Sequence, residues 1–224
     1  MKIAMIGAGY VGLVSGACFS EFGHHVTCVD QDELKVGRLR RNEIPIYEPG
    51  LDALVARSAA AGRLKFEKDL SAAVADAELV FIAVGTPSRR GDGHADLTYV
   101  REAAKQIAAA MDGYTAVVTK STVPVGTGRE VADIIRATNP KADFDVISNP
   151  EFLREGSAID DFMRPNRVVI GVESERGREK MRELYRPLFL IETPILFTGL
   201  ETAELIKYAA NGFLAMKILS LIHI

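Results

Sequence analysis

Two patterns of apolar and polar positions alternate along the chain. Runs of consecutive apolar residues, rich in valine and isoleucine, predict buried strands at residues 2–7, 25–30, 79–85, 115–121, 144–150 and 167–172. Stretches with an apolar residue at every third or fourth position predict helices at residues 12–23, 51–62, 97–111 and 128–139. This alternation favours an α/β fold with a doubly wound parallel sheet.

The pattern changes near the end of the chain. From about Glu201 onward a single unbroken helical run extends to the last residue. We therefore expect one domain at residues 1–198 and the start of a second, helical one at residues 199–224. The run carries Lys207 and Asn211 four residues apart, so both side chains face one side of the helix.

The first predicted strand leads into a glycine-rich turn. Gly7, Gly9 and Gly12 form a G-x-G-x-x-G pattern between this strand and an apolar helix. Such glycines allow a tight turn, the approach of a pyrophosphate to the backbone, and close packing of helix on strand. The combination predicts a Rossmann-like dinucleotide-binding domain.

Asp30 ends the second predicted strand, where a carboxylate can accept hydrogen bonds from the ribose hydroxyls and repel a 2′-phosphate. The expected cofactor is therefore NAD rather than NADP. Lys35, one turn into the next helix, is either a cofactor contact or a solvated helix residue. Thr86 and Thr122 follow two further strands and either face the cofactor or close turns.

Polar residues also follow the strand at 144–150, in the stretch SNPEFLREG. Glu151 and Glu155 lie close to the expected nicotinamide position, where a low dielectric can bring a carboxyl pKa toward neutrality. They are candidates for general acid or base groups. The alternative is a loop that starts a helix, with Glu151 near the helix N-terminus.

Composition limits the classes of partner. The 224 residues carry a formal net charge of −3 and a sequence pI near 5.9, which disfavours duplex nucleic acid and anionic membranes as partners. We expect no metal site, no signal peptide and no membrane-spanning segment, and hence a cytoplasmic protein. Cys18 and Cys28 lie in apolar runs and are expected to be buried packing residues rather than disulfide partners.

Seven ordered segments resemble one family. GAGYVGL, PIYEPGL, VGTPS with GDGHADLTYV, KSTVPVGT, NPEFLREGSAIDDFMRPNRVVIG and ELIKYAANGFLA are similar to the UDP-glucose/GDP-mannose dehydrogenases from Met1 to about Ile218. The resemblance implies oxidation of UDP-glucose to UDP-glucuronate by two hydride transfers to NAD, through a thioester on a cysteine. Alternatives are GDP-mannose or a UDP-N-acetylhexosamine as substrate, or a non-catalytic nucleotide-binding module.

The resemblance also implies roles for particular residues. The implied cofactor contacts are Gly7, Gly9, Tyr10, Val11, Gly12, Asp30, Lys35, Thr86, Thr122 and Glu155. The implied substrate contacts are Glu151, Phe152, Leu153, Arg154, Glu155, Lys207 and Asn211. Among these, Glu151 is the implied general acid or base and Thr122 helps to position water. Lys207 is the implied cation near the sugar C6 oxygen, with Asn211 as its neighbour.

Members of this family continue for about as long again, through a helical domain that forms a homodimer and a second α/β domain with the nucleophilic cysteine. Neither Cys18 nor Cys28 matches that nucleophile. The ending KILSLIHI also lacks the polar residues expected there. We therefore expect an N-terminal portion, truncated inside its connecting helix, that lacks the complete activity.

Overall fold

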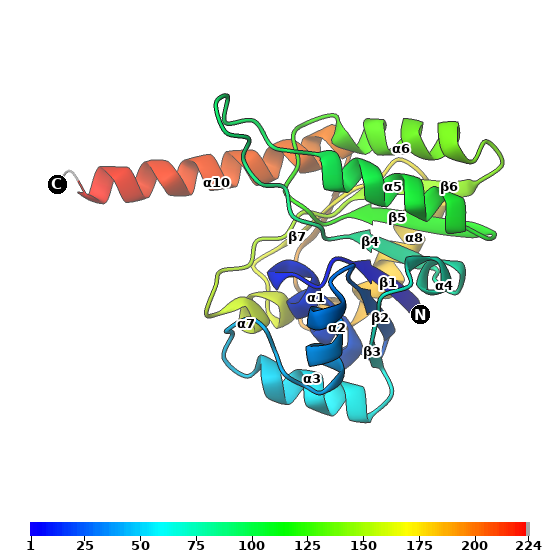
Figure 1. The fold of residues 1–224 in the computed structure, drawn as a ribbon. Helices are drawn as coiled ribbons and strands as arrows, with labels where there is room; N and C mark the ends of the chain where they lie inside the picture. Colours follow the sequence, from blue (N-terminus) through cyan, green and yellow to red (C-terminus); the bar gives the residue numbers. More distant parts are fainter. Residues whose placement is uncertain (223–224) are drawn as a thin grey trace.

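The structure, a computed structural model, describes residues 1–222 as one eight-stranded sheet with helices on both faces (Figure 1). The strands are β1 (Lys2–Ile6), β2 (His25–Val29), β3 (Leu64–Glu67), β4 (Leu79–Ile82), β5 (Tyr114–Thr119), β6 (Asp143–Ser148), β7 (Val168–Gly171) and β8 (Ile195–Thr198). The helices are α1 (Tyr10–Glu21), α2 (Glu33–Arg40), α3 (Leu51–Ala60), α4 (Leu70–Ala75), α5 (Thr98–Ala110), α6 (Thr127–Thr138), α7 (Ala158–Met163), α8 (Glu175–Leu184), α9 (Arg186–Phe189) and α10 (Leu200–Ile222).

The strand order confirms the predicted α/β fold. It runs β3-β2-β1-β4-β5-β6-β7-β8, and its first six positions follow the order of a Rossmann sheet. The order reverses between β1 and β4, and in such sheets ligands bind at this point beyond the carboxyl ends of the strands. The glycine turn after β1 and the loops after β4 and β5 lie at this edge.

Two apolar layers hold the helices on the sheet. On one face α1, α3, α7 and α8 share a core that is centred on Phe19, whose ring packs against Phe81, Phe162 and Tyr185. On the other face α4, α5 and α6 pack over the second core. Both faces of β1, β4 and β5 are buried, which explains their uninterrupted apolar sequences.

One junction departs from the expected parallel sheet. β7 pairs antiparallel with β6, through Ser148 and Gly171, whereas all other neighbouring strands are parallel. A parallel neighbour requires a crossover that returns the chain to the amino edge. The segment after β6 instead stays near the carboxyl edge and forms only the six-residue α7, which packs on α1. The chain therefore enters β7 in the opposite direction.

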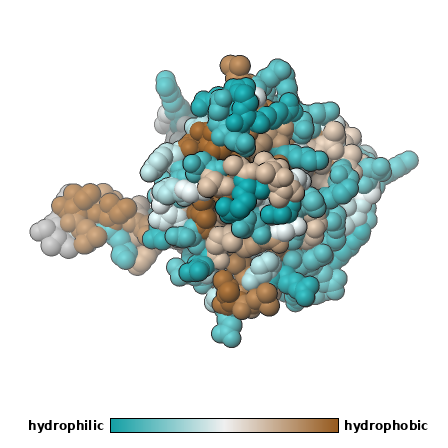
Figure 2. All heavy atoms as spheres, turned by 90° about the horizontal axis from the view of Figure 1, so that it is seen from below, coloured by the Kyte–Doolittle hydropathy of each residue, from teal (hydrophilic) through white to brown (hydrophobic). Residues whose placement is uncertain are grey.

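Helix α10 begins at Leu200 and is continuous to Ile222, the last described residue, as the sequence predicted. Its first two turns bury Leu200, Ala203, Glu204 and Lys207 against β7, β6 and α6. The remaining turns extend away from the sheet, and their apolar side chains form the projection in Figure 2. The division into domains near Gly199 remains a prediction.

By length and composition alone, α10 could cross a membrane, since an 18-residue window has a mean hydropathy of 1.4. No membrane-spanning segment was predicted from the sequence. At the start of the helix Glu204 and Lys207 are buried and make polar contacts with the rest of the domain. One helix of this kind is weak evidence for a membrane span, because the apolar helices of globular assemblies have the same composition.

Candidate active site

The glycine turn between β1 and α1 has the geometry that a dinucleotide requires. Gly7 adopts a φ of 102°, and a Cβ there would lie 2.6 Å from the Ala83 carbonyl oxygen. A Cβ on Gly12 would lie 1.9 Å from the Gly7 carbonyl oxygen. By contrast, a Cβ on Gly9 would meet no atom within 4 Å. The first and third glycines therefore allow packing inside the protein, while Gly9 leaves space outside it, at the N-cap of α1.

Asp30 lies directly beside this turn. Its Oδ2 accepts hydrogen bonds from the Ala8 amide at 3.0 Å and from Lys35 Nζ at 2.7 Å, and its Oδ1 accepts from the Asp32 amide at 3.0 Å. The structure therefore brings Lys35 to the carboxylate that was expected to bind the ribose. Tyr10 and Val11 form the first turn of α1, next to the same glycines.

Thr86 and Thr122 meet at the ends of β4 and β5. The Thr86 hydroxyl donates to the Thr122 carbonyl oxygen at 2.9 Å, and the Ser121 hydroxyl donates to the Val84 carbonyl oxygen at 2.7 Å. The two loops are thus fixed to each other at the topological switch point. The Thr86 hydroxyl therefore holds the two loops together. Its contact with a cofactor remains a prediction.

Glu151 and Lys207 form a nearly buried ion pair, although they are 56 residues apart in sequence. Lys207 Nζ lies 3.0 Å from Glu151 Oε1, and the two side chains are 7% and 13% exposed. Glu151 Oε2 accepts a hydrogen bond from the Leu153 amide at 2.6 Å. Lys207 Nζ also lies 5.3 Å from the centre of the Phe152 ring. The loop after β6 and the second turn of α10 therefore create one polar site.

A groove of about 730 Å³ opens beside this pair. It is lined by Phe152, Leu153 and Arg154 of the loop after β6, called the substrate loop here after its predicted role, by Lys207 and Asn211, and by Arg164 and Arg167. Asn211 is exposed and lies on the same wall as Lys207. Arg154 pairs with Asp161 at 2.7 Å, and the Arg167 guanidinium lies 4.3 Å from the centre of the Phe152 ring. The lining carries four cationic side chains and two carboxylates, Asp160 and Asp161, so the groove is positive on balance and has space for a phosphorylated ligand.

Glu155 does not join the buried pair. It is exposed, and its negative charge acts on the Tyr10 hydroxyl beside the glycine turn. Burial is the main cause that raises the pKa of Tyr10, followed by its hydrogen bond to Glu48. Glu155 therefore lies toward the glycine turn, whereas Glu151 lies beside the groove.

Glu48 connects the glycine turn to the end of the loop after β6 and was missed as a site residue. Its side chain is buried and accepts hydrogen bonds from the Tyr10 hydroxyl, from the Gly156 amide at 2.8 Å and from the Ala158 amide at 2.8 Å. Burial acts to raise the pKa of Glu48, but these hydrogen bonds outweigh it and the pKa lies below its usual value. The only signal in the sequence was an acidic residue between apolar positions in PIYEPGL.

Lys120 is a second missed residue. It is 4% exposed, and its Nζ donates to Asn149 Oδ1 at 3.1 Å and to the Tyr185 hydroxyl at 3.4 Å. Burial lowers the pKa of Lys120 to about 8, partly offset by the charge of Glu151. A lysine at the end of the apolar run TAVVTKS was the available signal.

The two cysteines lie in the interior, as expected from their apolar surroundings. Cys18 and Cys28 are free thiols with 0% and 1% exposure. Burial raises the pKa of each thiol to about 12, so neither forms a thiolate near neutral pH. Among residues 1–222, no three His, Cys, Asp or Glu side chains are grouped in a way that could hold a metal ion.

The sheet order, the glycine turn and Asp30 together define a dinucleotide-binding protein of the Rossmann type. Residues 1–189 match the model of the UDP-glucose/GDP-mannose dehydrogenase family, NAD binding domain. The chain belongs to this family.

Two curated relatives illustrate the similarity in sequence. The UDP-glucose 6-dehydrogenase of Rhizobium meliloti is 66% identical over 220 residues, which are 97% of this chain and 50% of the relative. The UDP-glucose 6-dehydrogenase TuaD of Bacillus subtilis is 52% identical, with 97% and 46% covered. The chain therefore spans about half the length of the curated relatives it matches.

Solved structures agree with the fold. A UDP-glucose dehydrogenase from Pyrobaculum islandicum superposes with a TM-score of 0.91 at 42% identity, over 96% of this chain and 50% of that one. A GDP-mannose dehydrogenase from Pseudomonas aeruginosa gives a TM-score of 0.92 at 38% identity, over 97% and 51%.

Proposed function

We propose that this chain supplies the NAD site and part of the catalytic site of a UDP-glucose 6-dehydrogenase. The observation that supports it most directly is the pair of Lys207 and Glu151 beside a basic groove, at the carboxyl edge of a dinucleotide-binding sheet. The 66% identity to the Rhizobium meliloti enzyme favours UDP-glucose over GDP-mannose as the sugar nucleotide.

The residues around the glycine turn fit NAD. The open space at Gly9 and the free amides at the start of α1 suit a pyrophosphate, and the Asp30 carboxylate suits the adenosine ribose. NAD would accept hydride from the sugar C6 carbon. Thr86, Thr122 and Glu155 lie on the loops that would surround the nicotinamide side.

Lys207 would act on the C6 oxygen. Its ammonium group is nearly buried, so its charge is little screened and can stabilise the negative charge that develops on that oxygen as hydride leaves. Glu151 holds this ammonium in place and is itself fixed by the Leu153 amide. Glu151 is therefore positioned to accept a proton, and in a later hydrolytic step to activate a water molecule that Thr122 helps to place.

A thioester intermediate requires a thiolate, and neither buried cysteine can provide one. The nucleophile, the sites that read the UDP portion and the homodimer contacts would belong to a longer protein that contains this chain. We propose a cytoplasmic location for that longer protein.

The test of the cofactor assignment is calorimetric titration of the 224-residue chain with NAD and with NADP. NAD should bind more tightly, and Asp30→Ala should weaken NAD binding by about 1–3 kcal/mol, as expected for lost hydrogen bonds to a charged acceptor. Asp52→Ala, which changes an exposed carboxylate on α3, is the matched control and should leave binding unchanged. Equal affinity for both dinucleotides would refute the assignment.

The test of the catalytic assignment needs a full-length dehydrogenase that contains this chain. Lys207→Ala should lower kcat by about a hundredfold or more, in line with the loss of a donor to a developing oxyanion. Lys217→Ala, an exposed position on the same helix, should have no such effect. The affinity for NAD should be the same in both variants and in the parent enzyme.

A further inference from the structure

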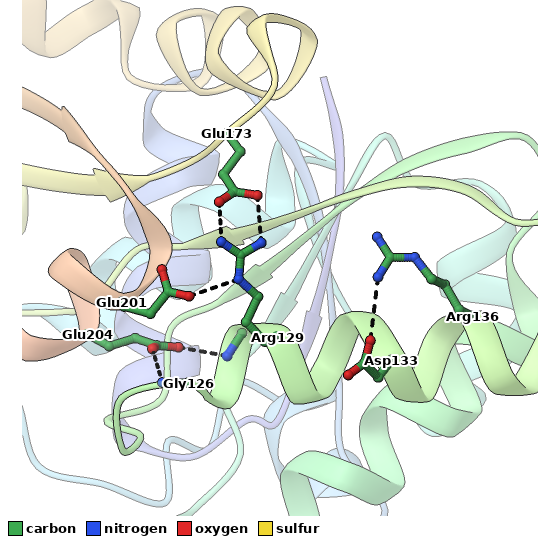
Figure 3. A network of polar contacts seen from close by, with 8 residues as sticks. Gly126, Arg129, Asp133, Arg136, Glu173, Glu201 and Glu204 are labelled. Carbon is green, nitrogen blue, oxygen red and sulfur yellow. Dashed lines mark hydrogen bonds and ion pairs between the residues drawn. The ribbon is translucent and has the colours of Figure 1, made fainter.

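Glu204, near the start of α10, is a buried carboxylate that binds the N-terminus of another helix. It is 2% exposed, its Oε2 accepts from the Gly126 amide at 2.7 Å, and its Oε1 accepts from the Gly128 amide at 2.7 Å (Figure 3). These amides belong to the start of α6, whose N-cap residue is Gly126 and offers no side-chain cap. Helix N-termini have unpaired amides and favour negative charge. Glu204 thus supplies from α10 the cap that α6 lacks.

The local sequence allows this close approach. A Cβ on Gly128 would lie 3.2 Å from Glu204 Oε1 and 3.7 Å from the Leu200 side chain, so a larger residue would crowd the contact. Arg129, the next residue, extends outward and pairs with Glu173 and, at 2.8 Å, with Glu201 (Figure 3). Those ion pairs are about half exposed, and exposed pairs of this kind contribute little to stability. The buried contact of Glu204 is therefore the stronger attachment of α10 to α6.

Lys207 lies three residues beyond Glu204, on the same buried face of α10. The other end of the contact is the β5–α6 loop, residues 120–126, in which Ser121 and Thr122 make hydrogen bonds to the loop after β4. The turns of α10 beyond Lys207 are largely exposed and offer no second attachment among the described residues. The orientation of the Lys207 side chain therefore depends on how the start of α10 is held.

We propose that Glu204 is a positioning residue, which by binding the α6 N-terminus keeps Lys207 Nζ against Glu151 and shielded from solvent. The functional meaning of this contact rests on the proposed role of Lys207 in hydride transfer. The structural claim is independent of it, because the position of Lys207 can be measured without turnover or cofactor.

The experiment measures the rate at which each lysine is acetylated by a small amine-reactive reagent, followed by mass spectrometry of peptides at low protein concentration. In the parent chain the exposed Lys217 should react fast, and the buried Lys207 and Lys120 should react slowly. In Glu204→Gln, Lys207 should react about tenfold faster or more, because the amide oxygen can accept from only one of the two backbone amides and its NH2 group faces the other donor. Lys120, which is held by Asn149 and Tyr185 and not by α10, should keep its slow rate.

Glu201→Gln is the matched control, because it removes an exposed carboxylate from the same helical turn. It should leave Lys207 protected. If Lys207 stays as slow in Glu204→Gln as in the parent, or reacts equally fast in Glu201→Gln, the proposal is overturned.

A second variant covers the case in which Glu204→Gln destabilises the whole fold and accelerates Lys120 as well. Gly128→Ala retains the carboxylate but crowds its Oε1, at a helical position that tolerates alanine. It should accelerate Lys207 by a smaller factor than Glu204→Gln and leave Lys120 slow. Acceleration of both lysines to the same extent in Gly128→Ala would show that Glu204 supports the fold in general, and would also overturn the proposal.

Discussion

Replacing Lys120 by methionine should change how the stability of this chain depends on pH. Lys120 is a cation in the interior, and burial lowers its pKa from 10.5 in the unfolded chain to about 8 in the folded protein. Between these two values the unfolded state binds more protons than the folded state, so the free energy of unfolding rises with pH. From pH 7 to pH 9 this single group should contribute a rise of about 1 kcal/mol.

The Lys120→Met variant removes this contribution and keeps a side chain of similar volume. Asn149 Oδ1 retains the Tyr185 hydroxyl at 2.6 Å as a donor, and the Tyr185 hydroxyl loses only the long 3.4 Å contact from Lys120. At pH 7 the variant should be as stable as the parent or more stable, since a desolvated charge is gone. At pH 9 its relative stability should be lower by about 1 kcal/mol.

Urea unfolding followed by circular dichroism at pH 7, 8 and 9, in the presence of a reducing agent, measures both proteins. The two cysteines and the buried tyrosines also titrate at alkaline pH, but they are common to both proteins and largely cancel in the difference. If the two proteins show parallel stability curves across this range, the folded-state pKa of Lys120 is not lowered and the reasoning is wrong.

Three further predictions concern the glycine turn, the thiols and α10. Gly12→Ala should destabilise the fold by about 2 kcal/mol or more in thermal unfolding, because its Cβ would overlap the Gly7 carbonyl, whereas Gly9→Ala should keep stability and weaken NAD binding. Both cysteines should resist alkylation at pH 8 until urea unfolds the chain. The chain should self-associate in sedimentation at micromolar concentration through the exposed apolar side chains of α10, and Leu214→Glu should reduce this association.

The central strands and the glycine turn were predictable because each is encoded locally. β1, β4 and β5 are buried on both faces and therefore have continuous apolar sequences. β3 and β8 were not predicted; each lies at an edge of the sheet and is only partly buried, whereas β4 and β7, which are equally short, are buried at every residue. Helix α8 was missed because its sequence ERGREKMREL buries only Met181 and Leu184 among its large side chains. α4, α7 and α9, with four to six residues, are too short to show a helical period.

The site residues also divide into those with a local signal in the sequence and those without one. Asp30 and the three glycines follow from spacing, and Lys207 with Asn211 follows from the resemblance and from helical geometry. Glu48 and Glu204 could not be assigned in this way, because their partners are backbone amides 76 to 110 residues away. The spacing of apolar residues gives no sign of such a contact. A single acidic residue in an apolar segment is equally compatible with a side chain exposed to solvent.

The buried charges suggest how the site keeps its shape. Glu48 connects the glycine turn to the end of the substrate loop, and Glu204 connects α10 to the β5–α6 loop. Glu151 connects the start of the substrate loop to Lys207. Burying a carboxylate is costly unless all its oxygens are paired, and each of these has at least two partners. Because each carboxylate has at least one partner on a different loop or helix from its own, displacement of one loop would leave a buried charge short of a partner, and this cost opposes independent movement of the loops around the site.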